Sequence, residues 1–221
     1  MRRRRGAGRP TREEGEKLAA LIVGVATSLF LKHGYGGTSI DLIAERARIS
    51  KGTFYTRFES KAAVFEAAMI EIARLFIPPR FVPERGEGPI ATRLERLAEN
   101  LLEIVFRPEV IALERVVTSE GARFPNMARS VHEKGTLEVV RRMTAFFADA
   151  MANGELKPGD PSLLAEQFLQ LAAFQFLRPA VHGVGPTRLD AALRSRLAAV
   201  VQLFLNGCGA DRAEDVPIPP T

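Results

Sequence analysis

A short donor-rich segment is the first place where this sequence could do chemistry. Its outward-facing members are predicted to be Lys51, Gly52, Thr53, Tyr55 and Arg57. Phe54 and Phe58 are interleaved with them at helical spacing and would turn toward a hydrophobic core. A helix with a buried back and a front of hydrogen-bond donors can enter the major groove of DNA. There a lysine or arginine can donate to guanine, and a threonine methyl can contact thymine.

The residues before this segment predict a second helix packed against it. Thr38 and Asp41 form a Thr-x-x-Asp pattern, in which the hydroxyl and the carboxylate cap the start of a helix. A small residue on the apolar face of this helix would let another helix cross closely. Ile49 would fill the turn between the two helices, and Ser50 can cap the one that follows. The sequence therefore predicts a helix-turn-helix.

At these residues the chain resembles a known family. The spacing TS-x4-A-x5-SKGTFY-x2-F-x2-K, spelled by Thr38 to Lys61, is similar to the DNA-binding domain of the TetR family of transcriptional regulators. The similarity extends over about Arg12 to Met69. It implies a three-helix DNA-binding domain, a fourth helix and an all-helical effector domain through which two subunits dimerise. The segment from Glu114 to Gly135 also resembles the C-terminal domain of the AefR-like, multidrug-type subgroup.

The resemblance implies a DNA contact for each matching residue. The hydroxyls of Thr38, Ser39 and Tyr55 are expected to bind phosphate oxygens, as is Lys61 at the start of the fourth helix. The residues expected closest to base edges are Lys51, Gly52, Thr53 and Arg57, and Ser50 is also expected at the DNA interface. Without a side chain, Gly52 would let the helix backbone approach the groove floor. For each residue alone, the alternative is an ordinary exposed polar position.

Arg48 stands where the family usually places glycine, in the turn between the two helices. A left-handed backbone there costs a non-glycine residue about 1 kcal/mol. Either Arg48 accepts this strain or the turn has a different shape. Its guanidinium could contact a phosphate, whereas an arginine in a surface turn is more usually only solvated.

The positive charge is concentrated near the N-terminus. Residues 1–61 hold 13 Lys/Arg against 6 Asp/Glu, the remainder holds 18 against 20, and the whole chain has a net charge of +5. Residues 1–10 are expected to form a basic arm that is disordered when free. Arg3, Arg4 and Arg5 would be attracted to phosphates whatever the base sequence, and entry of the arm into a minor groove is the alternative.

Apolar periodicity predicts an all-α protein. The first helix is expected over 11–33, and four prolines and two glycines mark 77–89 as a boundary. Later helices are expected over 90–106, 109–119, 126–151, 162–178 and 188–207. The predicted divisions are a basic arm (1–10), a helix-turn-helix DNA-binding domain (11–60), a connecting helix (61–76), an effector-binding and dimerisation domain (90–208) and a frayed tail (209–221).

The last two predicted helices favour a dimer. Segment 162–178 is apolar on nearly every side, and such a helix is buried on every side. Its own domain would cover one face and a second subunit the other, in a four-helix interface across a two-fold axis. The residues expected in this interface are Leu164, Phe168, Leu171, Leu193, Leu197, Val200 and Phe204. The alternative is a central core helix in a monomer.

A ligand site is expected among aromatic residues of the C-terminal half. The candidates to line an apolar cavity are Phe106, Phe124, Phe146, Phe147, Phe168 and Phe174. The resemblance implies a small-molecule effector, and this lining suits a hydrophobic or aromatic one. The effector would move the DNA-binding domains of the two subunits apart and so weaken DNA binding. Each phenylalanine alone is more simply part of a core. A cationic ligand would need a buried acid, which the sequence does not identify.

Enzymes, metals and cofactors are not expected. His33, His132 and His182 lie in different segments without zinc-binding spacing, and Cys208 is the only cysteine. Neither a glycine-rich phosphate loop nor a nucleophile elbow is present. No apolar stretch approaches about 18 residues, and acidic residues stand where a secretion signal would be apolar, so a cytoplasmic protein is expected.

The sequence therefore predicts a dimeric, sequence-specific DNA-binding regulator of transcription, most simply a repressor released from a palindromic operator by its ligand. Two alternatives remain. One is a ligand-responsive activator. The other is a protein that binds DNA or anionic surfaces nonspecifically through its basic arm, and such a protein would not prefer an operator over random DNA.

Overall fold

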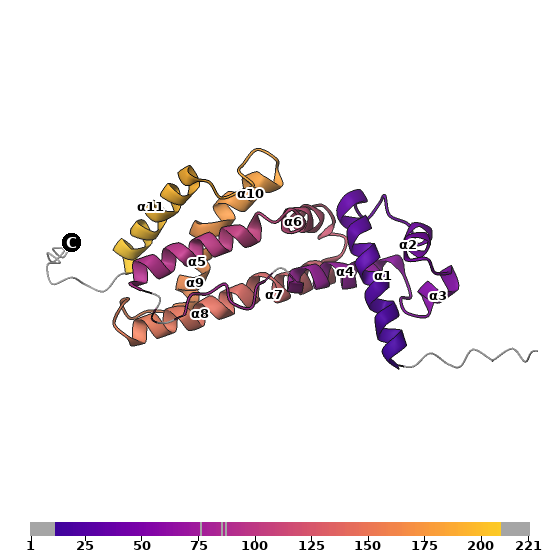
Figure 1. Cartoon of the computed structure of the whole chain (residues 1–221), viewed down its shortest axis with the longest axis horizontal. Helices are drawn as coiled ribbons and strands as arrows, with labels where there is room; N and C mark the ends of the chain where they lie inside the picture. Colours follow the sequence, from indigo (N-terminus) through magenta and orange to yellow (C-terminus); the bar gives the residue numbers. More distant parts are fainter. Residues whose placement is uncertain (1–11, 76, 85, 87, 209–221) are drawn as a thin grey trace, which may run out of the picture.

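The computed structural model describes residues 12–75, 77–84, 86 and 88–208, which form helices joined by loops (Figure 1). The helices are α1 (Arg12–His33), α2 (Ile40–Ala47), α3 (Lys51–Tyr55), α4 (Lys61–Leu75), α5 (Ile90–Val105), α6 (Pro108–Glu120), α7 (Pro125–Lys134), α8 (Thr136–Ala152), α9 (Pro161–Leu169), α10 (Gln175–Val181) and α11 (Ala191–Cys208). A π-helical turn, η1 (Gln170–Phe174), joins α9 to α10. The described residues contain no strand, which confirms the all-α prediction.

The molecule is elongated, with α1–α3 at one end and α5 and α8–α11 toward the other (Figure 1). Helices α4, α6 and α7 lie between the two ends, where α6 contacts α1 and α7 contacts α4. A change in the packing of α6 or α7 can therefore reach α1 and α4, the helices that flank the helix-turn-helix.

The first helix ends where a glycine permits a reversal. Ile22, Ala26 and Phe30 form its buried face, and all three are 0% exposed. Gly34 follows with φ of 69°, and its N–H donates to the carbonyl of Phe30 at 2.9 Å. Glycine adopts this left-handed conformation without a steric penalty, so the chain can turn back toward α2.

Two hydrophobic cores organise the helices. The N-terminal core surrounds Phe30, Phe54 and Phe65 and also takes in Leu113 of α6 and Met127 of α7. The C-terminal core joins residues of α5, α8, α9, α10 and α11. Because α6 and α7 contribute to the N-terminal core, the helix-turn-helix is packed against the segment that follows α5.

The predicted helix over 126–151 is wrong, because the chain breaks at Gly135 into α7 and α8. Gly135 has φ of −97° and ψ of −87°, outside the helical region. A Cβ added there would lie 2.8 Å from the carbonyl oxygen of Val131 and 3.7 Å from the Cβ of Ala73 in α4. The close contact is with the Val131 carbonyl, whereas the distance to Ala73 is an ordinary one, so a residue without a side chain fits the sharp turn between α7 and α8.

The predicted helix over 162–178 is interrupted by η1 and continues beyond its expected end. The α10 helix contains Pro179 and runs to Val181. Proline lacks an N–H, which favours a helix end in sequence reasoning, but one missing bond near the last turn is tolerated here. The widened turn η1 carries Gln170 and Phe174 toward a cavity described below.

Most of the residues predicted to form the dimer interface pack inside one subunit. Phe168, Leu193, Leu197 and Phe204 are 0%, 7%, 1% and 7% exposed and belong to the C-terminal core. Leu164, Leu171 and Val200 are half-buried. The exposed leucines of these helices are instead Leu163 on α9 and Leu203 on α11, at 52% and 66%. Periodicity identifies a buried stripe, but it does not tell a partner helix of the same chain from one of another copy.

Within the described residues, no helix is both long enough and apolar enough to cross a membrane.

Candidate nucleic-acid interface and ligand cavity

The cap of α2 is one residue later than predicted. Ser39 has an extended backbone, and its Oγ accepts from the N–H of Leu42 at 3.1 Å. Thr38 is 1% exposed, and its hydroxyl donates to the carbonyl of Gly34 at 2.9 Å. The predicted cap at Thr38 is therefore wrong, and its side chain fixes the loop between α1 and α2 instead of presenting a hydroxyl to phosphate.

The turn between α2 and α3 contains a residue with a left-handed backbone, which is the strained alternative. Arg48 has φ of 55° and ψ of 43°, and it is the one non-glycine residue with positive φ among those described. Its N–H donates to the carbonyl of Glu45 at 3.1 Å, and the N–H of Ile49 donates to that of Ala44 at 2.9 Å. These hydrogen bonds satisfy carbonyl groups at the C-terminal end of α2. Nothing in the structure explains why arginine rather than glycine stands here.

The α3 helix is short, but it is capped at its N-terminus and anchored to the core along its back. The Oγ of Ser50 accepts from the N–H of Thr53 at 3.0 Å and shares a 2.9 Å hydrogen bond with the Thr53 hydroxyl. Phe54 is 0% exposed and fastens the back of the helix to the N-terminal core. The front consists of Lys51, Gly52, Thr53 and Tyr55, which we call the reading surface; Tyr55 is 53% exposed.

Gly52 is not required by the packing of the protein itself. It lies on an exposed part of α3, and an added Cβ would meet only the Oγ of Ser50, at an ordinary 3.6 Å. Glycine inside a helix is less favourable than alanine by about 0.5–1 kcal/mol. The reason for a glycine at this position therefore lies outside the folded chain, which fits a close approach by another molecule.

Lys51 is paired across the turn. Its Nζ lies 2.6 Å from Oδ1 of Asp41, and the two side chains are 57% and 67% exposed. The hydrogen bond to Asp41 raises the pKa of Lys51, so the ammonium stays charged. Because the pair is well solvated, it contributes little to stability and can exchange for another anion.

Two further residues that were predicted to contact DNA, Arg57 and Lys61, also make contacts within the subunit. The guanidinium of Arg57 lies over α1, where a Cβ added to Gly15 would stand only 2.7 Å from its Nη2. The Nζ of Lys61 donates to the carbonyls of Tyr35 and Thr38, both at 2.9 Å, and lies 4.1 Å from the Tyr35 ring centroid. Lys61 thus joins the start of α4 to the loop before α2. Arg3, Arg4 and Arg5 lie outside the described residues.

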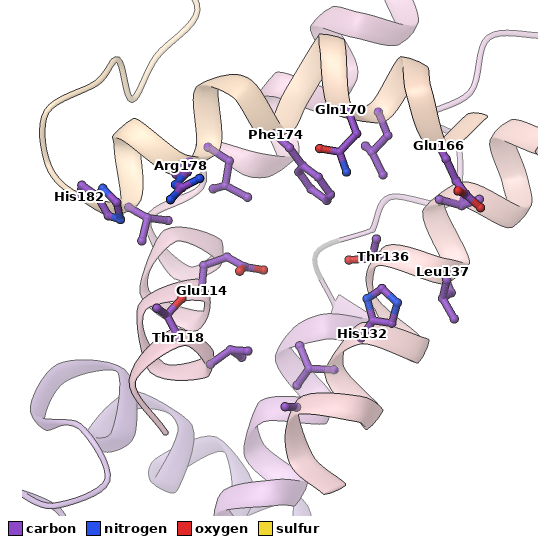
Figure 2. A pocket seen from close by; sticks show the side chains of 17 residues that line it. Glu114, Thr118, His132, Thr136, Leu137, Glu166, Gln170, Phe174, Arg178 and His182 are labelled. Carbon is purple, nitrogen blue, oxygen red and sulfur yellow. The ribbon is translucent and has the colours of Figure 1, made fainter. Parts of the chain in front are cut away.

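The second site is a cavity of about 740 Å³ between α6, α7, α8, α9, η1 and α10, which we call the chamber. Its polar lining consists of Glu114, Thr118, His132, Thr136, Glu166, Gln170, Arg178 and His182 (Figure 2). Figure 2 shows Glu114 on α6 and Phe174 of η1 pointing into the space between the helices. Within the described residues, no group of three or more metal-binding side chains could hold a metal ion.

Of the six phenylalanines predicted to line a ligand site, only Phe174 lines the chamber. Phe146, Phe147 and Phe168 pack as an aromatic group in the C-terminal core, where Phe106 is also buried. Phe124 lies in the other core, with ring centroids 4.5 Å from Tyr35 and 5.2 Å from Phe65. The structure packs these five side chains in or against the two cores, so their predicted place in the cavity lining is wrong.

Glu114 is the functional candidate that sequence reasoning missed. Burial raises the pKa of its carboxyl, and the nearby His132 offsets part of this effect. A signal was present, because Val110, Glu114 and Val117 recur at intervals of four and three. A carboxylate in an otherwise apolar stripe of a helix would face the interior or a cavity.

Comparison with known proteins accounts for both halves of the chain. Residues 22–68 match the family described as bacterial regulatory proteins of the tetR family, and residues 92–209 match the AefR-like transcriptional repressor C-terminal domain. The uncharacterized HTH-type transcriptional regulator YhgD of Bacillus subtilis is 28% identical over 152 residues, which cover 68% of this chain and 78% of YhgD.

Solved structures of similar fold cover nearly the whole chain. A TetR-family transcriptional regulator from Mesorhizobium loti aligns with a TM-score of 0.79 and 24% identity, over 91% of this chain and 100% of that one. The flavonoid-responsive regulator FrrA aligns with a TM-score of 0.74 and 29% identity, over 88% of this chain and 98% of FrrA.

Proposed function

Because this chain belongs to the TetR family of DNA-binding transcriptional regulators, we propose that it is a repressor that binds a palindromic operator as a dimer and is released by a small molecule. The observation that carries the DNA-binding part is the reading surface. A capped helix fixed by buried Phe54 presents a lysine, a threonine and a tyrosine around a glycine that the fold does not need.

On operator DNA the reading surface would lie in the major groove. Lys51 would exchange Asp41 for a guanine edge or a phosphate, and Gly52 would let the α3 backbone approach the base pairs. Ser39 and Tyr55 would bind phosphate oxygens. Lys61 uses two of its three ammonium donors within the subunit, which leaves one for a phosphate.

A dimer is proposed because one short helix offers few base contacts. The exposed Leu163 and Leu203, on α9 and α11, favour a second copy as the partner of this side of the molecule. Two reading surfaces would then reach half-sites separated by about one helical turn of DNA, roughly 34–36 Å.

Release would depend on the packing between the chamber and the helix-turn-helix. The chamber is lined by α6 and α7, and Phe124, in the loop between them, packs against Tyr35 and Phe65. A ligand that favours a different arrangement of α6 and α7 would shift the N-terminal core with them. Its effect on DNA binding is limited to its differential affinity for the two arrangements. That the similar FrrA is described as flavonoid-responsive supports a small-molecule signal in general terms.

The test is a competition gel shift with the DNA upstream of the gene. A repressor of this kind binds that fragment at least about 1,000-fold more tightly than random DNA at physiological salt. Equal binding to both DNAs would favour the nonspecific alternative instead. A reporter under the same promoter separates the roles, because deleting the gene raises expression for a repressor and lowers it for an activator.

A further inference from the structure

The chamber continues into a narrow apolar space of about 80 Å³, which we call the extension. Residues that line both spaces mark the junction between them: Glu114, Val131, Thr136, Leu169, Phe174 and Leu177. Beyond this junction the extension is walled by apolar side chains of α4, α5 and α6, among them Ile72, Leu101 and Leu113.

The size of the extension restricts what can enter it. An engineered apolar cavity of about 150 Å³ holds one benzene molecule. At roughly half that volume, the extension can accept a short alkyl chain but not an aromatic ring. A flat aromatic ligand would therefore be confined to the chamber, whereas a molecule with a flexible tail can use both spaces.

Glu114 is the one charged side chain that lines both spaces. Burial raises the pKa of its carboxyl, and the charge of the nearby His132 offsets part of this effect. The other charged or titratable residues of the chamber, His132, Glu166, Arg178 and His182, are exposed at its mouth. Removing a carboxylate from water is costly, and a cation placed beside it would relieve that cost.

We propose that the effector is an amphiphilic amine, with its protonated nitrogen at Glu114 and an alkyl tail in the extension. Calling this ligand the effector rests on the proposed function, but its binding to the free protein does not. The tail would contact Ile72 and Ala73 of α4, opposite the corner where Gly135 approaches Ala73. Filling this space would act on the helix that joins the chamber to the helix-turn-helix.

Calorimetric titration of the free full-length chain near neutral pH tests the assignment, with n-octylamine, n-octanol and octanoate as probes. Octylamine is expected to bind at least about tenfold more tightly than octanol, and octanoate most weakly, because the three share one tail and differ in charge. From butylamine upward, each added methylene should improve affinity about fourfold until the extension is full.

Two variants separate the head from the tail. Glu114→Gln should remove the preference for octylamine over octanol while octanol still binds. Glu109→Gln, at an exposed position of the same helix outside both spaces, is the matched control and should leave that preference unchanged. Val110→Phe, which fills the half-buried wall of the extension, should abolish the gain with chain length.

Equal binding of octylamine and octanol to the unaltered chain would overturn the proposal, as would a preference for the amine that survives Glu114→Gln. Neither result depends on DNA, so they do not bear on the gel shift above. Conversely, failure of the gel shift would refute the proposed function while leaving the ligand chemistry as measured.

Discussion

The reading surface and the chamber are built in opposite ways. The reading surface depends on contacts that span three or four residues, such as Ser39 to Leu42 and Ser50 to Thr53. The chamber instead brings together six elements, α6 to α10 and η1, from residue 114 to residue 182. Local caps and one anchor in the core, Phe54, set the shape of the reading surface, whereas the chamber exists only if several helices pack correctly. Substitutions should therefore act sharply at the reading surface and diffusely around the chamber.

The largest expected effect is loss of the anchor behind the reading surface. Phe54→Ala empties a fully buried site in the N-terminal core and should lower the free energy of unfolding by about 3–5 kcal/mol. Urea denaturation measures this change, and a gel shift should show no operator binding. Octanol binding to the chamber should persist at low temperature. If chamber binding is lost in proportion to DNA binding, the two regions are not built independently.

A smaller effect is expected at the corner between α7 and α8. A Cβ from Gly135→Ala would stand 2.8 Å from the Val131 carbonyl, so α7 must shift, at a cost of about 1–3 kcal/mol. Thermal denaturation and ligand titration should both report the change, because Val131 and Gly135 line the extension. Gly36→Ala is the control, since a Cβ there meets nothing within 4 Å. Equal losses for the two variants would contradict the close approach of Gly135 to the Val131 carbonyl.

Relief of backbone strain at Arg48 should stabilise the protein. Arg48→Gly replaces a left-handed arginine and should raise the free energy of unfolding by up to about 1 kcal/mol. Operator affinity measured at several salt concentrations then decides whether the guanidinium contacts DNA. We expect the salt dependence to stay unchanged. A decrease of the log–log slope by about one would assign a phosphate contact to Arg48.

The exposed ion pair should give the smallest change in stability. Asp41→Asn frees Lys51, and because both side chains are well solvated the melting temperature should not move measurably. Operator affinity should rise, since a carboxylate that competes with DNA for Lys51 is gone. Lys51→Ala should lower it. A fall in affinity for Asp41→Asn would mean that the pair positions Lys51 rather than competing with DNA.

The N-terminal half could be predicted from sequence because its determinants are local. The end of α1 at Gly34, the helix-turn-helix and the anchor Phe54 follow from spacing and cap chemistry. The cap of α2 was predicted at Thr38 but lies at Ser39. Both hydroxyls suit the position, and only tertiary packing buries that of Thr38. Strain at Arg48 was one of two predicted outcomes, and the backbone settles it.

The chamber could not be predicted in the same way. Gly135 looks like one glycine inside an amphipathic helix, and only the folded backbone, with φ of −97° and ψ of −87°, shows that the helix breaks there. Leu193 and Leu197 follow a stripe that fits a partner subunit as well as it fits the C-terminal core that they occupy. Which phenylalanine faces a cavity depends on such long-range packing. A charged residue in an apolar stripe, Glu114, was the more informative local signal.

The most direct test of the account compares two glycines that the fold does not require. Gly52 lies on the reading surface and Gly24 on an exposed face of α1, and neither has a close neighbour for an added Cβ. Changing either to alanine should leave the melting temperature equal or higher. Gly52→Ala should also weaken operator binding by about tenfold or more, because the new methyl keeps α3 from the groove, whereas Gly24→Ala should not. Equal operator affinity for the two variants would contradict the placement of α3 in the major groove.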